Sequence, residues 1–353
     1  MEEYLFQKSE LLISEDGANL VKRTKDIAFI ATGKYWVNNH AHIMNSIDIS
    51  ILMYIKFYIN NISIKDYVTG SAQPKLTQRN LALIKVPLPP LPEQQRIVSK
   101  IEELFAELDK IDKAQETYDS AAKQLREKVL DCAMRGKLVP QDPNDEPASE
   151  LLKRIEEEKQ QLIEQKVVPK VANSSIENNE LPFSIPNSWK FVRLGMIANT
   201  TKFQSIKPND IPLGTWIVGM GDIEKETGKI LKQEYISEYS DIKSNKYKFS
   251  KSDILYGKLN PYLKKIFVAP QEGVCTTEFI PIHLYGYCSP EYYSMILKYK
   301  HISLLIDEAS YGATLPRVKP NFIGNLIVPL PPMNEQFNIV QKAKQIFTLF
   351  NLI

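Results

Sequence analysis

The chain contains two copies of one sequence block, and this internal repeat restricts the folds that are open to it. Residues 70–111 align without a gap onto residues 312–353 at an offset of 242. At the centre of the match, VPLPPLPEQQRIVSKIEELF from Val86 pairs with VPLPPMNEQFNIVQKAKQIF from Val328. A second block, YLFQKSELL at 4–12, pairs with YKFSKSDIL at 247–255. This period is too long for a solenoid, so it predicts two copies of a whole domain, each followed by an exit helix.

The two copies differ in extent. Residues 181–246 precede the YKFSKSDIL block and have the composition of folded sequence, whereas only residues 1–3 precede YLFQKSELL. We therefore expect an α+β fold in which the first domain is partial. The expected divisions are a partial first domain over 1–91, a long helix over 92–134, a linker with a charged helix over 135–180, a second domain over 181–332 and the start of a second helix over 333–353.

Both exit segments have apolar residues at alternating spacings of four and three, which is typical of a coiled-coil seam. The residues expected to pack between helices are Ile97, Ile101, Leu104, Leu108, Ile111, Leu125, Ile339 and Ile346. The first helix would span about 60 Å at 1.5 Å per residue. The PLPP segments cannot be helix interior because proline has no amide donor, and we expect stiff elbows. A proline-rich ligand for an SH3-like domain is a weaker alternative.

Charge is distributed unevenly along a chain of ordinary composition. Residues 181–320 contain eighteen Lys and Arg against thirteen Asp and Glu, whereas 92–134 and 135–180 each contain seven against ten. The three cysteines lack the spacing of a zinc site or a disulfide framework. The N-terminus does not read as a signal peptide, and no apolar run is long enough to span a membrane, so we expect a cytoplasmic protein.

Several motifs resemble those of type I restriction-modification specificity subunits. They are GSAQPKL at 70–76, VPLPPLPEQQRIV at 86–98, AMRGKLVPQ at 133–141 and the degenerate VPLPPMNEQ at 328–336. LISEDGANL at 12–20 and WVNNHAHI at 36–43 resemble the interior of a target recognition domain. The resemblance implies two such domains held apart by antiparallel helices, each reading one half of a bipartite DNA site.

The same resemblance implies partners and a lack of catalysis. The helices would fix the unread DNA spacer and dock methyltransferase subunits, two being expected, and restriction subunits would join this complex. S-adenosylmethionine, ATP and Mg²⁺ would be bound by those partners, and this chain would hold no cofactor and perform no chemistry.

DNA binding needs cations for phosphates and polar side chains for base edges. The candidate contacts are Lys22, Arg23, Asn38, Asn39, Lys75, Lys243, Lys246, Lys258, Asn260, Tyr262, Lys264, Lys265 and Arg317. Any single lysine among them is more often a solvated surface charge. His40 and His42 alternate as on a strand, and we favour ordinary strand residues over a two-histidine metal site.

Enzyme motifs do not provide a competing function. Asn260-Pro261-Tyr262 lacks one proline of the Asn-Pro-Pro-Tyr signature of amino-methyltransferases, and GMGD at 219–222 lacks the continuation of a dinucleotide loop. Two alternatives remain open from the sequence. The first is a scaffold whose helices mediate assembly without DNA readout, and the second is an enzyme in its own right.

Overall fold

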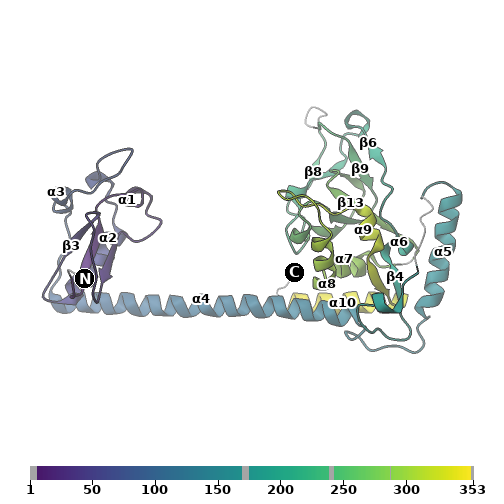
Figure 1. Cartoon of the computed structure of the whole chain (residues 1–353), viewed down its shortest axis with the longest axis horizontal. Helices are drawn as coiled ribbons and strands as arrows, with labels where there is room; N and C mark the ends of the chain where they lie inside the picture. The colour runs from purple at the N-terminus through teal and green to yellow at the C-terminus, as the bar shows by residue number, and fades with distance from the viewer. Residues whose placement is uncertain (1–5, 169–174, 238–241, 287, 351–353) are drawn as a thin grey trace. The chain divides into compact units, whose positions relative to one another are not determined.

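The structure, a computed structural model, describes residues 6–168, 175–237, 242–286 and 288–350. Contacts divide the chain into two compact units, residues 1–118 and 119–353 (Figure 1). The division falls inside the long helix α4 (Leu91–Met134), so each unit contains part of this helix. None of the helices within the described ranges is long and apolar enough to cross a membrane. The mixture of helix and sheet confirms the expected α+β class.

The first unit is built on a three-stranded antiparallel sheet of order β2-β1-β3. Its elements are β1 (Glu10–Ser14), α1 (Asn19–Lys22), β2 (Ala28–Ala31), β3 (Ala41–Met44), α2 (Ile49–Asn61), the 3-10 turn η1 (Lys65–Tyr67) and α3 (Gln78–Leu81). Leu11 and Ile13 of β1 pack with Leu52 and Ile59 of α2 in one buried cluster. The side chain of Asp48 caps α2 by accepting a hydrogen bond from the Ser50 N–H. The apolar positions of β1 are therefore buried in the centre of the sheet and under a helix.

The second unit is larger and contains three sheets, with strand orders β11-β10-β13-β5, β6-β9-β12-β7-β8 and β14-β4. Its strands are β4 (Lys190–Arg193), β5 (Ala198–Asn199), β6 (Ser205–Ile206), β7 (Trp216–Val218), β8 (Glu234–Tyr235), β9 (Lys246–Phe249), β10 (Ile254–Gly257), β11 (Ile266–Val268), β12 (Gly273–Cys275), β13 (Phe279–Leu284) and β14 (Ile327–Leu330). Its helices after α4 are α5 (Ala148–Glu164), α6 (Leu194–Ile197), α7 (Pro290–Lys298), α8 (Lys300–Glu308), α9 (Pro320–Asn325) and α10 (Met333–Leu349). Short 3-10 turns lie at Asn178–Glu180, Pro208–Asp210, Met220–Asp222 and Pro261–Leu263.

The sequence repeat corresponds to a structural repeat. Strand β10, which contains the second copy of the β1 sequence, lies between β11 and β13 just as β1 lies between β2 and β3, and all four pairings are antiparallel. The hydroxyl of Tyr54 on α2 donates to the carbonyl of Pro87, and the hydroxyl of Tyr293 on α7 donates to that of Pro329. These two prolines are equivalent in the alignment, so the repeat extends beyond the strands to the helix that covers them.

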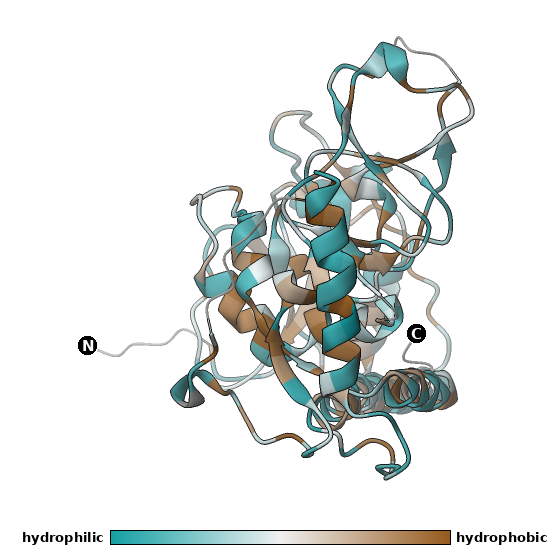
Figure 2. Cartoon of the chain, turned by 90° about the vertical axis from the view of Figure 1, so that its right-hand side faces the viewer, coloured by the Kyte–Doolittle hydropathy of each residue, from teal (hydrophilic) through white to brown (hydrophobic). Residues whose placement is uncertain are grey.

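Helix α5 is the charged helix expected within the 135–180 linker, but one face of it is buried. Leu151 and Ile155 are buried in the main core of the second unit, and the ammonium of Lys159 donates to the carbonyl of Gly195. Figure 2 shows mainly hydrophilic residues on the outward side of α5. The EEE and QQ runs lie between apolar residues spaced four apart, and one face can therefore be buried.

Helix α10 packs along the C-terminal part of α4 (Figures 1 and 2). Ile339 is fully buried in the same cluster as Val129 and Ala133, and Leu125 and Ile346 pack against that cluster. The remaining residues of the expected seam are less buried. Ile97 and Ile101 are half-buried, whereas Leu104, Leu108 and Ile111 are 53%, 53% and 62% exposed. The expected burial of these last three is therefore wrong for this chain, because its apolar helix partners lie at the other end of α4.

Candidate nucleic-acid interface

One loop of the first unit joins the covering helix to the end of the central strand. The backbones of Thr69 and Lys75 exchange hydrogen bonds of 2.9 and 2.7 Å, which closes the loop GSAQP between them. The loop is then fixed to the strand that ends at Ser14, because the Gly17 N–H donates to the Pro74 carbonyl at 3.0 Å and the Leu76 N–H to the Glu15 carbonyl at 2.7 Å. This anchoring holds Lys75 beside the end of β1.

The second unit contains the same loop on the same strand end. The backbones of Tyr311 and Arg317 exchange hydrogen bonds of 2.9 and 2.8 Å. The Asn260 N–H donates to the Pro316 carbonyl at 2.8 Å, and the Val318 N–H donates to the Lys258 carbonyl at 3.1 Å. Each of these bonds has its counterpart in the first unit. Two loops with different sequences, GSAQP and GATLP, therefore place a cation at the same position.

Glycine is required where each loop starts. Gly70 and Gly312 have φ angles of +86° and +97°, in the left-handed region that side chains with a Cβ avoid. A Cβ on Gly70 would lie 2.5 Å from the carbonyl oxygen of Gln73, and one on Gly312 would lie 3.0 Å from that of Leu315. The glycine thus permits the tight reversal that returns the chain to the strand.

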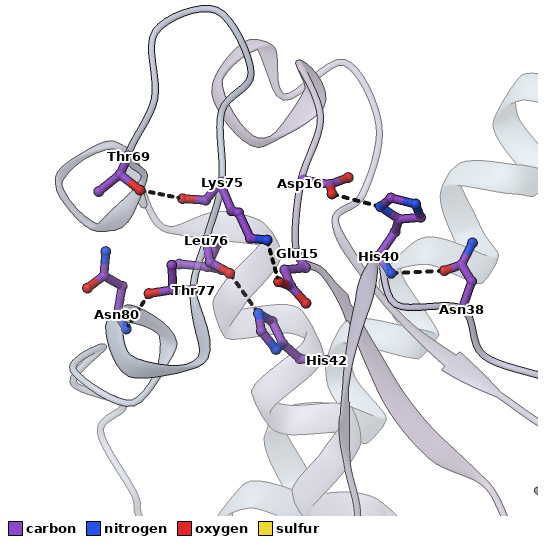
Figure 3. A network of polar contacts seen from close by, with 10 residues as sticks. All are labelled: Glu15, Asp16, Asn38, His40, His42, Thr69, Lys75, Leu76, Thr77 and Asn80. Atoms are coloured by element: carbon purple, nitrogen blue, oxygen red, sulfur yellow. Dashed lines mark hydrogen bonds and ion pairs between the residues drawn. The ribbon is translucent and has the colours of Figure 1, made fainter.

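Acidic side chains balance the loop cations. In the first unit the Lys75 ammonium lies 3.0 Å from a Glu15 carboxylate oxygen, and the ring of His40 bonds Asp16 at 2.7 Å (Figure 3). In the second unit the Arg317 guanidinium bonds both oxygens of Glu278 at 3.2 and 3.3 Å. Half of the Lys75 side chain and a third of the Arg317 side chain stay exposed. Each carboxylate orients its cation while leaving it accessible to a ligand from solvent.

The other candidate contacts are distributed around these loops and strand ends. Lys22, Asn38, Asn39, Lys243 and Tyr262 are exposed, while Lys258, Asn260 and Lys264 are half-buried. Asn260 and Lys264 have positive φ angles of 50° and 48° and flank the turn that carries Tyr262. Asn260 and Lys258 contact the Arg317 loop through their backbones. The structure therefore brings Lys258, Asn260 and Arg317 to one place, and Lys264 and Tyr262 lie on the adjoining turn.

Three predicted contacts have structural roles instead. The Arg23 guanidinium donates to the carbonyls of Ile59, Asn60 and Ile62 at the C-terminal end of α2. Lys246 is only 6% exposed, its ammonium bonds the carbonyl and hydroxyl of Ser244, and burial lowers its pKa.

Lys265 is half-buried and donates to the Met220 carbonyl. Cation counts along a sequence cannot distinguish such internal donors from free surface charges.

The two histidines have separate partners. His40 bonds Asp16, whereas the Nε2 of His42 on β3 lies 2.7 Å from the Leu76 carbonyl, at the exit of the loop (Figure 3). No cluster of three potential metal ligands occurs within the described ranges. The His42 ring thus braces the loop exit against β3, whereas the His40 ring ties the residue before β3 to the end of β1.

Comparison with known proteins places these features in a family. Residues 1–117 match a family model described as a type I restriction modification DNA specificity domain. The EcoDI specificity subunit of Escherichia coli, a type I restriction enzyme subunit, is 27% identical over 99% of this chain and 73% of its own length. The chain is therefore similar to type I restriction specificity subunits along nearly its whole length. The EcoEI specificity subunit of the same organism is 35% identical over 62% of this chain and 38% of its own length.

A solved structure shares the fold of this chain. It comes from a study of complex assembly and conformational transition of the type I R-M system, and it aligns with a TM-score of 0.55 over 98% of this chain and 76% of its own. Its sequence identity is 15%. The likeness therefore concerns the arrangement of elements and not the side chains of the interface.

Sequence reasoning missed the acidic partners of the interface. Glu15 and Asp16 directly follow β1, and Glu278 directly precedes β13. The position after a central strand was a usable signal for the first two. Glu278 is distant in sequence from Arg317, and nothing in the sequence pattern joins them.

The second unit also contains a groove, lined by both apolar and polar residues, that the sequence did not reveal. Its polar lining residues include Lys202, Gln204, Lys248, Asp253 and His283, and apolar residues such as Phe203 and Phe249 line the rest. The His283 ring lies 2.7 Å from an Asp253 oxygen, and this hydrogen bond raises the pKa of His283 above its ordinary value of 6.5. Asp253 is almost fully buried, whereas more than half of the His283 side chain is exposed.

The raised His283 pKa predicts a pH-dependent contribution to stability. A histidine with a raised folded-state pKa stabilises the fold fully below its unfolded pKa, and this contribution is lost as pH rises through the folded pKa. His283→Gln should therefore lower the free energy of unfolding more at about pH 5.5 than at about pH 8.5. Because the ring is exposed, the difference should stay below about 1 kcal/mol. Equal losses at both pH values in denaturant titrations would contradict the assignment.

The loop geometry predicts that Gly70→Ala destabilises the protein more than a matched glycine change. Gly33 has a similar φ of +82°, but a Cβ there would meet nothing within 4 Å. Both substitutions incur a left-handed backbone cost of about 1–2 kcal/mol. The clash at Gly70 should add about 1 kcal/mol or more. Chemical denaturation of the two variants measures this difference, and equal stabilities would show that the loop can open without cost.

Proposed function

We propose that this chain binds double-stranded DNA through the equivalent loops of its two units, and that it directs the partner subunits of a type I restriction-modification complex to a bipartite site. This proposal rests on one repeated feature. In each unit, a loop that bears a cation is fixed to the end of the central strand. A two-part DNA site requires two similar surfaces, and the loops around Lys75 and Arg317 provide them.

The loop cations suit DNA for a physical reason. Phosphate contacts position a protein on the duplex, and polar side chains at base edges supply specificity. In the second unit Arg317, Lys258 and Lys264 supply charge, while Asn260 and the exposed Tyr262 supply hydrogen-bonding groups. In the first unit Lys22 and Lys75 supply charge and Asn38 and Asn39 supply amides.

Catalysis belongs, in this proposal, to the partner subunits. Two methyltransferase subunits would dock on this chain, and restriction subunits would join through them. S-adenosylmethionine, ATP and Mg²⁺ would be bound by these partners. The exposed apolar face of α4, which includes Leu104, Leu108 and Ile111, supports a protein-binding role for this helix.

Salt-titrated DNA binding tests the proposal. The full chain should bind a mixed-sequence duplex with an affinity that falls steeply between about 50 and 200 mM salt. Lys75→Gln and Arg317→Gln should each reduce the slope of log affinity against log salt by about one if each contacts a phosphate. Fluorescence anisotropy with labelled duplex measures both quantities.

Lys153→Gln is the matched control. It removes the same charge from an exposed lysine on α5 that also pairs with a carboxylate, that of Glu150. It should leave the slope unchanged. Binding that does not depend on salt, or equal effects of all three substitutions, would instead favour a scaffold without DNA readout.

A further inference from the structure

Strand β14 of the second unit is completed by a partner strand from a distant part of the sequence. β14 pairs antiparallel with β4, with Val328 opposite Val192 and Leu330 opposite Lys190. The pairing continues at the Leu194 N–H, which donates to the Leu326 carbonyl at 2.9 Å. β4 thus covers the VPLPP segment just before α10 begins.

Among residues 6–118, no strand covers the equivalent segment of the first unit. Residues 84–88 correspond to 326–330, and the Tyr54 bond to Pro87 holds them against their helix as the Tyr293 bond holds Pro329. Within the described residues, however, no backbone group pairs with Val86 or Leu88. These two residues therefore present an open strand edge, which is a template for another chain.

Side-chain exposure follows the same difference. Leu88 is 68% exposed, whereas its counterpart Leu330 is fully buried. Val86 is half-buried and Pro87 exposed, whereas Val328 and Pro329 are buried. Because the same sequence is fully buried in one copy, its exposure in the other marks a surface built to be covered.

A buried acid of the second unit indicates what the covering segment contains. The Glu335 side chain, at the start of α10, is 2% exposed and accepts a 2.7 Å hydrogen bond from the indole of Trp189, the residue before β4. Its counterpart Glu93, at the start of α4, is exposed. Glu93 is thus an acceptor placed beside the open edge, where an indole N–H would complement it.

We propose that the first unit binds, along residues 84–88, an extended strand that lies outside residues 6–350 of this chain. The strand has a tryptophan followed by alternating apolar residues, as in the Trp189–Leu194 sequence WKFVRL. Its backbone pairs with Val86 and Leu88, its apolar side chains cover Leu88, and its indole donates to Glu93. This is strand addition to a sheet edge, in which main-chain bonds give affinity and side chains give selectivity.

The repeat also sets where the bound segment ends. In the second unit Gly324 lies beside Thr200, and a Cβ on Gly324 would be 2.6 Å from the Thr200 hydroxyl oxygen. The first unit has Ala82 at the equivalent position. A ligand for the first unit must therefore stop, or carry a smaller residue, before the position of Thr200.

A synthetic peptide with the sequence of residues 186–198, labelled with a fluorophore, tests the proposal on the full chain. Anisotropy should report saturable binding, and Leu88→Asp should weaken it at least about ten-fold, because a carboxylate would be placed under the added strand. Leu231→Asp is the matched control, since Leu231 is a leucine of the second unit that is 59% exposed, and this variant should bind the peptide as the parent chain does.

Substitutions in the peptide test the same contacts without altering the protein. Peptides carrying Val192→Asp or Trp189→Ala should bind at least about ten-fold more weakly, and hydrogen exchange at the Val86 and Leu88 amides should slow only with the parent peptide. No binding at millimolar peptide, or binding unaffected by Leu88→Asp, would overturn the proposal. A concentration-dependent dimer that Leu88→Asp abolishes would also overturn it, because a second copy of this chain would then be the partner.

Discussion

Each unit depends on the backbone pairing between the end of its central strand and the loop that follows its covering helix. In the first unit the bonds from Gly17 to Pro74 and from Leu76 to Glu15 tie sheet, helix and loop together, and the bonds from Asn260 and Val318 do so in the second. The glycine with a positive φ angle makes this closure possible. The closure in turn fixes the position of the cation that follows the loop proline. A loop anchored so near a buried strand is preorganised, so little ordering entropy remains to oppose binding of a phosphate.

The two units share one arrangement of strand, helix and loop, but they differ in the elements that cover it. In the second unit β4, α5 and α10 cover the residues that follow the loop, and the core extends without interruption from Leu151 of α5 to Phe347 of α10. In the first unit the residues equivalent to this covered surface, from Pro87 to Phe105, remain largely open. The same sequence block therefore serves as core in one unit and as accessible surface in the other, and surface of this kind is available to partners.

The sequence alone predicted the repeat, the α+β class, the long helix and the family, because each depends on patterns spread over many residues. It did not predict which lysines were internal donors. Arg23 and Lys246 read like their neighbours, yet one caps a helix and the other is buried against Ser244. The burial of α5 was missed since its charged runs hide a narrow apolar stripe. The partnership of Arg317 with Glu278 arises only from the fold, because the two residues lie on separate elements far apart in the chain.

The most direct test of a DNA-reading role is a methylome map of cells with and without this gene. If the chain directs a methyltransferase to a bipartite site, deletion should remove methylation from one two-part sequence motif and leave all other motifs unchanged. Restoring the gene should restore that motif, and restoring it with Arg317→Gln should alter or weaken methylation there. A methylome that is identical with and without the gene would contradict the assignment.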